Sequence, residues 1–370
     1  MNKHNLKNLY ELMEEELHNL NVPEEFCKLN SFITDGKKSA LFIRQLLDDE
    51  SFNIPDERSD LYRIAEMRAR HSAVTFLMGL VFRKFAGLFD KIPTIINKDN
   101  SFAMQMWLIT SLYHDKAYSS EYIKYEYIDY ISKFRPFLLT DDNTKFSHIY
   151  PDTLAYTYAD ISNYDRYAVS FHQNKPTNEK RDHGILGGIM MYSELSKRAL
   201  KQNNDSELPI IKACSLAVAQ HNIFKSSNKE RDKEYKKYDL NTLLSTSTFK
   251  IRHEKALLLF LSLIDTIECV KKFSQSQKSN RYLETLTTLK SIKLSVSEHE
   301  ILLDLSELSK RINEKYDFEL NNMFDNYINV LRTINTWTEI KIADRGANQF
   351  AISLGQPLES AENKILVAAI

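Results

Sequence analysis

The spacing of apolar residues along the chain predicts a mainly helical protein, because these residues recur at helical intervals over long stretches. Ser101 is a suitable N-cap for one of the helices, and Pro209 suits the first turn of another. The chain contains only 8 Gly and 8 Pro, so these residues encode few turns and long helices are favoured. We expect helices over residues 60–89, 101–114, 121–134, 182–200, 209–221 and 252–273.

The last part of the chain has a different pattern, in which short apolar runs predict strands. Residues 291–305 are expected to form one or two strands, and 339–342 and 350–354 are expected to form a hairpin around a loop of several residues. A helix is expected over 312–336. We therefore predict three regions: an N-terminal helical segment over 1–60, a helical core over 61–280 with a lid insert near 139–181, and a small α+β region over 285–370.

Composition, charge and cysteine usage narrow the class of protein. Apolar residues make up 43% and aromatic residues 11% of the 370 residues, which is enough for a sizeable core. The formal net charge of −1 does not mark the chain as a nucleic-acid binder. Cys27, Cys214 and Cys269 show no metal or redox spacing, which favours a reducing cytoplasm. The longest apolar run, 72–82, is far shorter than the ~20 residues of a membrane span, so we expect a soluble cytoplasmic protein.

Imidazole and carboxylate side chains at or inside the expected helices are candidate metal ligands. A single His beside an apolar helix is more often a packed core residue than a ligand. Asp265 is harder to explain in that way, because a carboxylate that follows the apolar run 256–264 would be buried and would need a partner or a metal ion. Imidazole and carboxylate together are the usual ligands of Mn, Fe, Co, Ni or Zn. The candidate ligands are His71, His114, Asp115, His183, His221 and Asp265.

The order of these ligands, His, His-Asp, His, His, Asp over residues 60 to 275, resembles the HD superfamily of metal-dependent phosphohydrolases. The resemblance implies an HD-type helical bundle that binds two divalent transition-metal ions. Members that cleave cyclic dinucleotides carry Gly and Lys where this chain has Ala117 and Tyr118, so the chain departs from that subclass. By resemblance, the first ion is held by His71, His114, Asp115 and Asp265, and the second by Asp115, His183 and His221.

A two-metal site of this kind implies hydrolysis at phosphorus. Two ions about 3.5–4 Å apart activate a bridging water for in-line attack, which makes Asp115 a catalytic residue. Lys116 is a second catalytic candidate that would contact a phosphate, with a solvated side chain as the alternative. Basic residues on both sides of the site would steer a polyanion, although a plain solvated loop remains an alternative. The substrate-binding candidates are Lys180, Arg181 and Lys225.

The expected substrate is a phosphodiester or phosphoanhydride in a nucleotide or single-stranded nucleic acid. The Tyr-rich insert at 139–181 either stacks a nucleobase or packs as a lid onto the core. A small class of di-iron oxygenases shares the same ligand order, so an oxygenase is the alternative enzyme. The remaining alternative is a non-catalytic helical sensor whose C-terminal region, 285–370, binds a protein partner.

Overall fold

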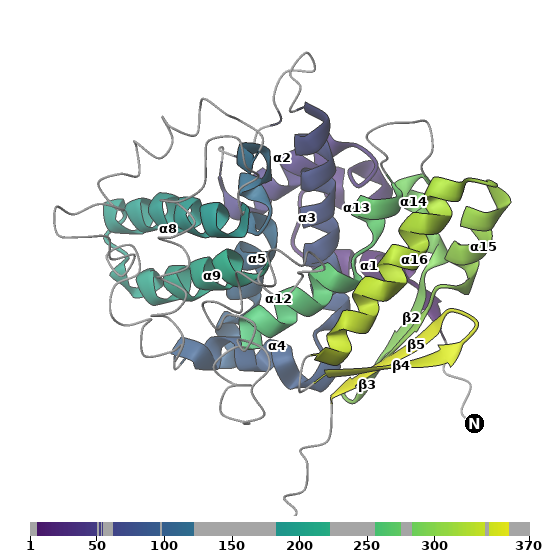
Figure 1. The fold of residues 1–370 in the computed structure, drawn as a ribbon. Helices are drawn as coiled ribbons and strands as arrows, with labels where there is room; N and C mark the ends of the chain where they lie inside the picture. The colour runs from purple at the N-terminus through teal and green to yellow at the C-terminus, as the bar shows by residue number, and fades with distance from the viewer. Residues whose placement is uncertain are drawn as a thin grey trace, which may run out of the picture.

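The structure is a computed structural model, and its helices dominate the part of the chain that it describes (Figure 1). This confirms the prediction of a mainly α protein with a small C-terminal α+β region. The helix expected over 121–134, apart from its first residue, and the insert at 139–181 lie outside the described residues. The described residues are 6–49, 52, 54, 62–96, 98–121, 183–222, 256–274, 283–336 and 340–354.

Helix α3 (Tyr62–Phe82) lies at the centre of the helical region and is buried along its second half. It contacts helices from the N-terminal part of the chain and helices more than 170 residues later, and several of them also contact one another. A bundle of this kind brings side chains that are far apart in sequence to one place. The helices that contact α3 include α1 (Leu9–His18), α2 (Gly36–Leu47), α5 (Ala103–Tyr113) and α12 (Ala256–Ile267). Helices α8 (His183–Lys201) and α9 (Leu208–Gln220) pack on each other, and α9 also contacts α5 and α12.

The first long helix ends earlier than the sequence pattern predicts. Helix α3 stops at Phe82, and the short helix α4 (Leu88–Lys91) begins after a break in which Ala86 and Gly87 adopt left-handed conformations. The backbone N–H of Ala86 donates to the carbonyl of Glu298 at 2.7 Å. A continuous helix over 60–89 was therefore the wrong expectation, because left-handed residues interrupt the helical hydrogen-bond ladder.

The same break bears on whether the chain could cross a membrane. Among the described residues, no single helix has the length and apolar composition of a membrane span. The two segments Tyr62–Phe82 and Phe85–Thr94 meet that requirement only when taken together, and they are bent by 100°.

Two other helix boundaries differ from the expectation. Helix α5 begins at Ala103 and is preceded by a 3₁₀ turn whose cap is Asp99, so Ser101 is not the N-cap. The apolar segment over 252–273 is divided, because α12 ends at Ile267 and the short helix α13 (Val270–Phe273) follows. The side chain of Glu268 accepts the backbone N–H of Val270 at 2.5 Å, which satisfies a donor at the start of α13.

The C-terminal region contains a five-stranded antiparallel sheet with the strand order β1-β2-β3-β5-β4. The expected hairpin is present as β4 (Ile340–Gly346) and β5 (Gln349–Leu354). Edge strand β1 (Lys7–Asn8) comes from the other end of the chain and pairs with β2. The remaining elements are β2 (Lys293–Val296), β3 (Glu300–Asp304), α14 (Thr285–Ser291), α15 (Ser306–Glu314) and α16 (Phe318–Arg332).

Helix α16 joins the C-terminal region to the helical core, and Figure 1 shows it passing in front of the sheet beside α12 and α13. The hydroxyl of Tyr327, on α16, donates to the carbonyl of Ile267 at the end of α12. Tyr327 is fully buried, so this hydrogen bond is shielded from water. The C-terminal region therefore supports the point at which α12 ends.

Helices α8 and α9 approach each other closely because a glycine lies at their contact. A Cβ atom added at Gly188 would lie 2.6 Å from the carbonyl oxygen of Ser215 and 2.7 Å from Cβ of Ala219. At the preceding Gly187, the nearest atom would be Cγ1 of Val218 at 3.3 Å. Only Gly188 therefore needs the absence of a side chain for these two helices to pack.

These two glycines give a matched pair of substitutions. We expect Gly188→Ala to lower the free energy of unfolding by about 1–3 kcal/mol, because the new methyl group overlaps backbone atoms of α9. Gly187→Ala should be within about 1 kcal/mol of the wild type, since helix propensity offsets a mild contact. Urea unfolding followed by circular dichroism measures both. Equal stabilities for the two variants would contradict the close packing of α8 on α9.

Candidate metal centre

All six predicted ligands lie together in the interior of the helical region. Each residue is at least nine-tenths buried, and the exposed fractions of the residues run from 0% for His71 and His114 to 9% for His183. They come from five separate helices: His71 from within α3, His114 and Asp115 from the end of α5, His183 from the first residue of α8, His221 from the end of α9, and Asp265 from within α12.

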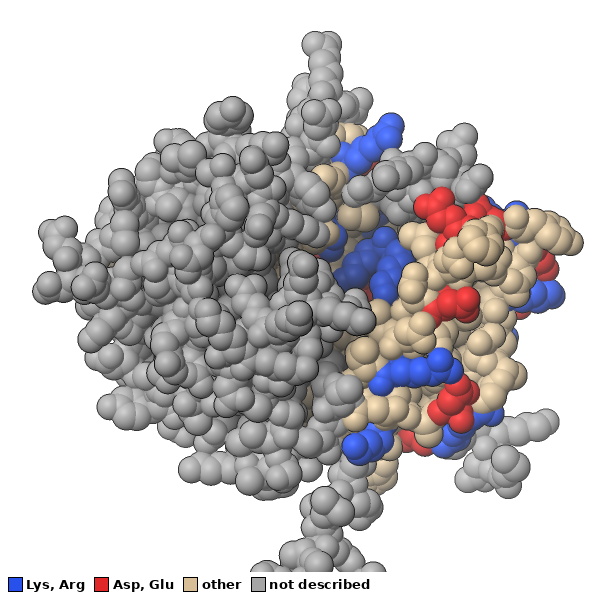
Figure 2. Space-filling view, in the orientation of Figure 1, with Lys and Arg blue, Asp and Glu red and all other residues tan. Residues whose placement is uncertain are grey.

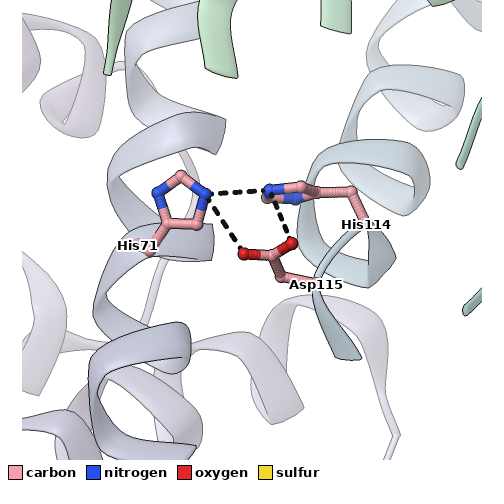
Figure 3. A group of neighbouring side chains, drawn as sticks. All are labelled: His71, His114 and Asp115. Atoms are coloured by element: carbon pink, nitrogen blue, oxygen red, sulfur yellow. Dashed lines mark hydrogen bonds and ion pairs between the residues drawn. The ribbon is translucent and has the colours of Figure 1, made fainter. Parts of the chain in front are cut away.

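The first group of ligands surrounds His71. Its Nε2 atom lies 3.0 Å from Nε2 of His114, 3.3 Å from Oδ2 of Asp115 and 3.0 Å from Oδ1 of Asp265. Figure 3 shows the imidazole of His71 pointing from α3 across to His114 and Asp115. Two nitrogen atoms and two carboxylates thus converge on one small volume.

The second group surrounds the other oxygen of the same aspartate. Oδ1 of Asp115 lies 3.0 Å from Nε2 of His183 and 3.8 Å from Nε2 of His221. The ligand atoms of Asp115, His183 and His221 all lie within 4.8 Å of one another, and the same holds for His71, His114 and Asp115. Asp115 is therefore shared between two adjacent groups of candidate ligands.

Hydrogen bonds on the far side of three imidazoles fix which nitrogen faces the cluster. Nδ1 of His71 lies 2.7 Å from Oε2 of Glu268, and Nδ1 of His114 and of His221 each lie 2.6 Å from a backbone carbonyl. Carboxylate and carbonyl oxygens only accept, so Nδ1 carries the proton in each neutral ring. The Nε2 atoms of these three rings therefore direct their lone pairs toward Asp115 and Asp265.

The charge states reinforce this arrangement. Burial, together with the nearby Lys271 ammonium, lowers the pKa of His71 to about 4, and burial lowers the pKa of His114 well below its usual value. Burial acts to raise the pKa of Asp115, but the Arg68 guanidinium and the adjacent imidazoles hold it well below its usual range. Neutral imidazoles and an ionised carboxylate form a cluster of lone pairs. Lone pairs of these two kinds are the ligands that divalent transition-metal ions bind in proteins.

Glu268 is a further residue of the site that the sequence pattern did not single out. Its side chain is fully buried, and it accepts the Nδ1 proton of His71 while its other oxygen accepts the N–H of Val270. Burial acts to raise the pKa of Glu268, but His71 and Lys271 lower it below its usual value. A carboxylate behind a His ligand fixes the orientation of the ring. Its position three residues after Asp265 was the available signal.

Two cations also contact the cluster. Nη1 of Arg68 lies 2.5 Å from Oδ2 of Asp115, and the guanidinium lies on the ring of Tyr118, 3.2 Å from its centroid. The Tyr118 ring in turn contacts the ring of His183, with 4.5 Å between their centroids. Nζ of Lys271 lies 2.5 Å from Oδ1 of Asp265. Arg68 precedes His71 by one helical turn, so its spacing could have identified it.

Lys116, predicted as a catalytic residue, directs its ammonium elsewhere. Its Nζ atom lies 2.5 Å from Oε2 of Glu194 and 3.7 Å from Oδ2 of Asp49. It also lies over the rings of Phe52 and Tyr113, at 4.5 Å and 4.7 Å from their centroids. These contacts tie α5, α8 and the residues after α2 together, which is a structural role.

The predicted substrate-binding residues are not placed by the structure. Lys180, Arg181 and Lys225 lie outside the described residues, as does the basic segment at 225–237. Comparison of the chain with protein families, with curated proteins and with solved structures finds no match. The arrangement of side chains is therefore the basis for inferring what the protein does.

Replacing Glu268 tests its role behind His71. We expect Glu268→Ala to weaken the binding of Mn²⁺ by about 10–100-fold, because the His71 ring loses the partner that holds its orientation. Glu268→Gln should lose less, since its amide oxygen can still accept the Nδ1 proton. Titration calorimetry with Mn²⁺ measures the affinity, and circular dichroism checks the fold. Wild-type affinity in a folded Glu268→Ala protein would exclude this role.

The buried imidazoles should also make the metal-free protein sensitive to acid. Since the pKa of His71 is lowered to about 4 in the folded state, the unfolded chain binds a proton that the folded protein does not. The contribution of His71 to the free energy of unfolding is therefore fully present above about pH 6.5. It decreases by about 3 kcal/mol as the pH falls toward 4.

Urea unfolding after removal of metal by a chelator, at several pH values in this window, measures the effect. The dependence on pH should be weaker in His71→Gln, which has no titrating ring. The same dependence in both proteins would show that other groups account for it.

Proposed function

We propose that the protein is a metal-dependent phosphohydrolase of the HD type, which hydrolyses a phosphodiester or phosphoanhydride bond in a nucleotide or nucleic acid. One observation carries this proposal: Asp115 is shared between two adjacent groups of buried ligands. A carboxylate between two groups of imidazoles is suited to bridging a pair of metal ions. The residues that would hold the ions are His71, His114, Asp115 and Asp265 for the first, and Asp115, His183 and His221 for the second.

A pair of divalent ions supplies Lewis-acid activation of water and of phosphoryl oxygens when it is bound. The chain's own residues prepare the site for this. Asp115 fixes the spacing between the two groups of ligands, and Glu268 holds the ring of His71 with its Nε2 lone pair directed inward. Burial keeps the imidazoles neutral, so protons do not compete for the ligand atoms at neutral pH.

Other expectations from the sequence remain part of the proposal. The three cysteines are free thiols, which agrees with a reducing cytoplasm. A nucleotide or a single-stranded nucleic acid is the proposed substrate, and the C-terminal α+β region is proposed as a surface for a protein partner. The metal is a transition metal among Mn, Fe, Co, Ni and Zn.

The test begins with metal analysis of the purified protein, followed by assays with phosphodiesters and nucleotides in the presence of Mn²⁺. We expect about two metal ions per chain and hydrolysis of at least one phosphate ester or anhydride. Asp115→Asn should abolish hydrolysis while the fold survives. Cys214→Ser is the control, because Cys214 is buried away from the cluster with its Sγ directed to the carbonyl of Met106 and its pKa raised to about 12 by burial.

His183→Ala separates the two groups of ligands. This variant should lose about half of the bound metal, because His183 belongs only to the second group. It should also lose phosphodiester hydrolysis. A wild-type ratio near one that is unchanged in His183→Ala would contradict a two-metal site. Bound iron, a coloured protein and oxygen consumption without phosphate release would identify an oxygenase instead.

A further inference from the structure

Lys271 places a positive charge on the ligand atoms of the first group. Its Nζ atom lies 2.5 Å from Oδ1 of Asp265 and 3.2 Å from Nε2 of His71. The side chain is 19% exposed, so most of it is shielded from water. The same oxygen and nitrogen are the atoms that would bind the first metal ion. An ammonium and a divalent ion cannot both use these lone pairs, and the two cations repel each other.

The position of Lys271 in the chain gives it room to move. It is the second residue of α13, and the break between α12 and α13 separates it from Asp265 by six residues. Its flexible hydrocarbon stem lets the ammonium turn away from Asp265 without a change in the backbone. Figure 2 shows Lys and Arg side chains gathered in a recess of the surface, in the area where α3 and α13 lie in Figure 1.

The balance of charge indicates what the displaced ammonium would bind. Before an ion binds, the carboxylates of Asp115, Asp265 and Glu268 are opposed by Arg68 and Lys271. If divalent ions were held by Asp115 and Asp265, these two carboxylates would be shared with the ions, and Lys271 would lose its ion pair with Asp265. A largely buried ammonium without a counter-ion is costly. An anion beside the bound metal removes that cost.

We propose that Lys271 is a tethered counter-ion of the first metal site: it occupies the ligand atoms of Asp265 and His71 until a metal ion displaces it, and it then binds an anionic phosphoryl oxygen of the substrate. This inference rests on the proposed function and adds a residue that positions the substrate. The site thus gains affinity for a phosphate only after the metal has bound. Metal and substrate therefore bind in a fixed order.

The experiment compares the wild type with Lys271→Met and with Lys272→Met as the matched control. Lys272 is the next residue of α13, and its ammonium lies over the ring of Tyr327 at 5.0 Å from the centroid. Calorimetry with Mn²⁺ alone measures metal binding to the metal-free proteins. Calorimetry with inorganic phosphate then measures anion binding to the Mn²⁺-loaded proteins.

We expect Lys271→Met to bind Mn²⁺ about tenfold more tightly than the wild type and phosphate about tenfold more weakly, each the size of one charge-assisted hydrogen bond. Lys272→Met should stay within about twofold of the wild type in both measurements. Lys271→Arg, which keeps the charge, should retain most of the affinity for phosphate. A role confined to supporting the fold would not strengthen metal binding.

Weaker or unchanged Mn²⁺ binding by a folded Lys271→Met protein would overturn the counter-ion role, and unchanged phosphate binding would overturn the substrate role. If Lys272→Met changed the affinities for Mn²⁺ and phosphate by the same amounts, the loss of one positive charge anywhere on α13 would explain both effects. If Lys271→Met does not fold, Lys271→Gln replaces it in the same comparison. Tighter Mn²⁺ binding without hydrolysis of any phosphate compound would refute the proposed function and leave the displacement by metal intact.

Discussion

The carboxylate of Asp115 is removed from solvent where α3, α5, α8 and α9 meet, and an ionised group in that position needs compensating charge and hydrogen-bond donors. Arg68 donates to one oxygen and Nε2 of His183 lies 3.0 Å from the other, whereas the Nε2 atoms of His114 and His221 add further acceptors. The core is thus organised around a concentration of acceptors, which hydrophobic packing alone would not favour. The acceptors come from the ends of α5 and α9 and the start of α8. The close contact at Gly188 and the buried Glu268 help to keep these side chains in position.

The helical core and the C-terminal α+β region could be predicted from the sequence because both have clear periodicity. The breaks in the two long apolar segments could not, since each depends on a distant or local contact that periodicity does not encode. Ala86 is held by the carbonyl of Glu298, which is more than 200 residues away along the chain. The end of α12 depends on Glu268, a charged residue in an apolar segment, and its partner His71 is 197 residues away along the chain.

At the candidate site, too, some features could be predicted from the sequence and others could not. The six predicted ligands lie together in the structure because side chains of that chemistry, placed on apolar helices, have few other reasons to be buried. Glu268, Arg68 and Lys271 were missed because Lys, Arg and Glu are common on solvated helix faces, whereas in the structure their charged groups lie against His71, Asp115 and Asp265. Lys116 shows the converse, since its place beside Asp115 in sequence does not bring its ammonium to the cluster.

The pairing of β1 with β2 has a consequence for how the protein is made. Lys7 and Asn8 form the edge of the sheet with Leu294 and Lys293, so this edge can close only after most of the chain has left the ribosome. The hydrogen bond between His71 and Glu268 also joins residues that are far apart in sequence, with a separation of 197. Contacts of such high separation form late in folding. The complete set of candidate ligands therefore exists only after the chain has been made through Asp265, and a chain that stops earlier would lack both this group of side chains and the sheet edge.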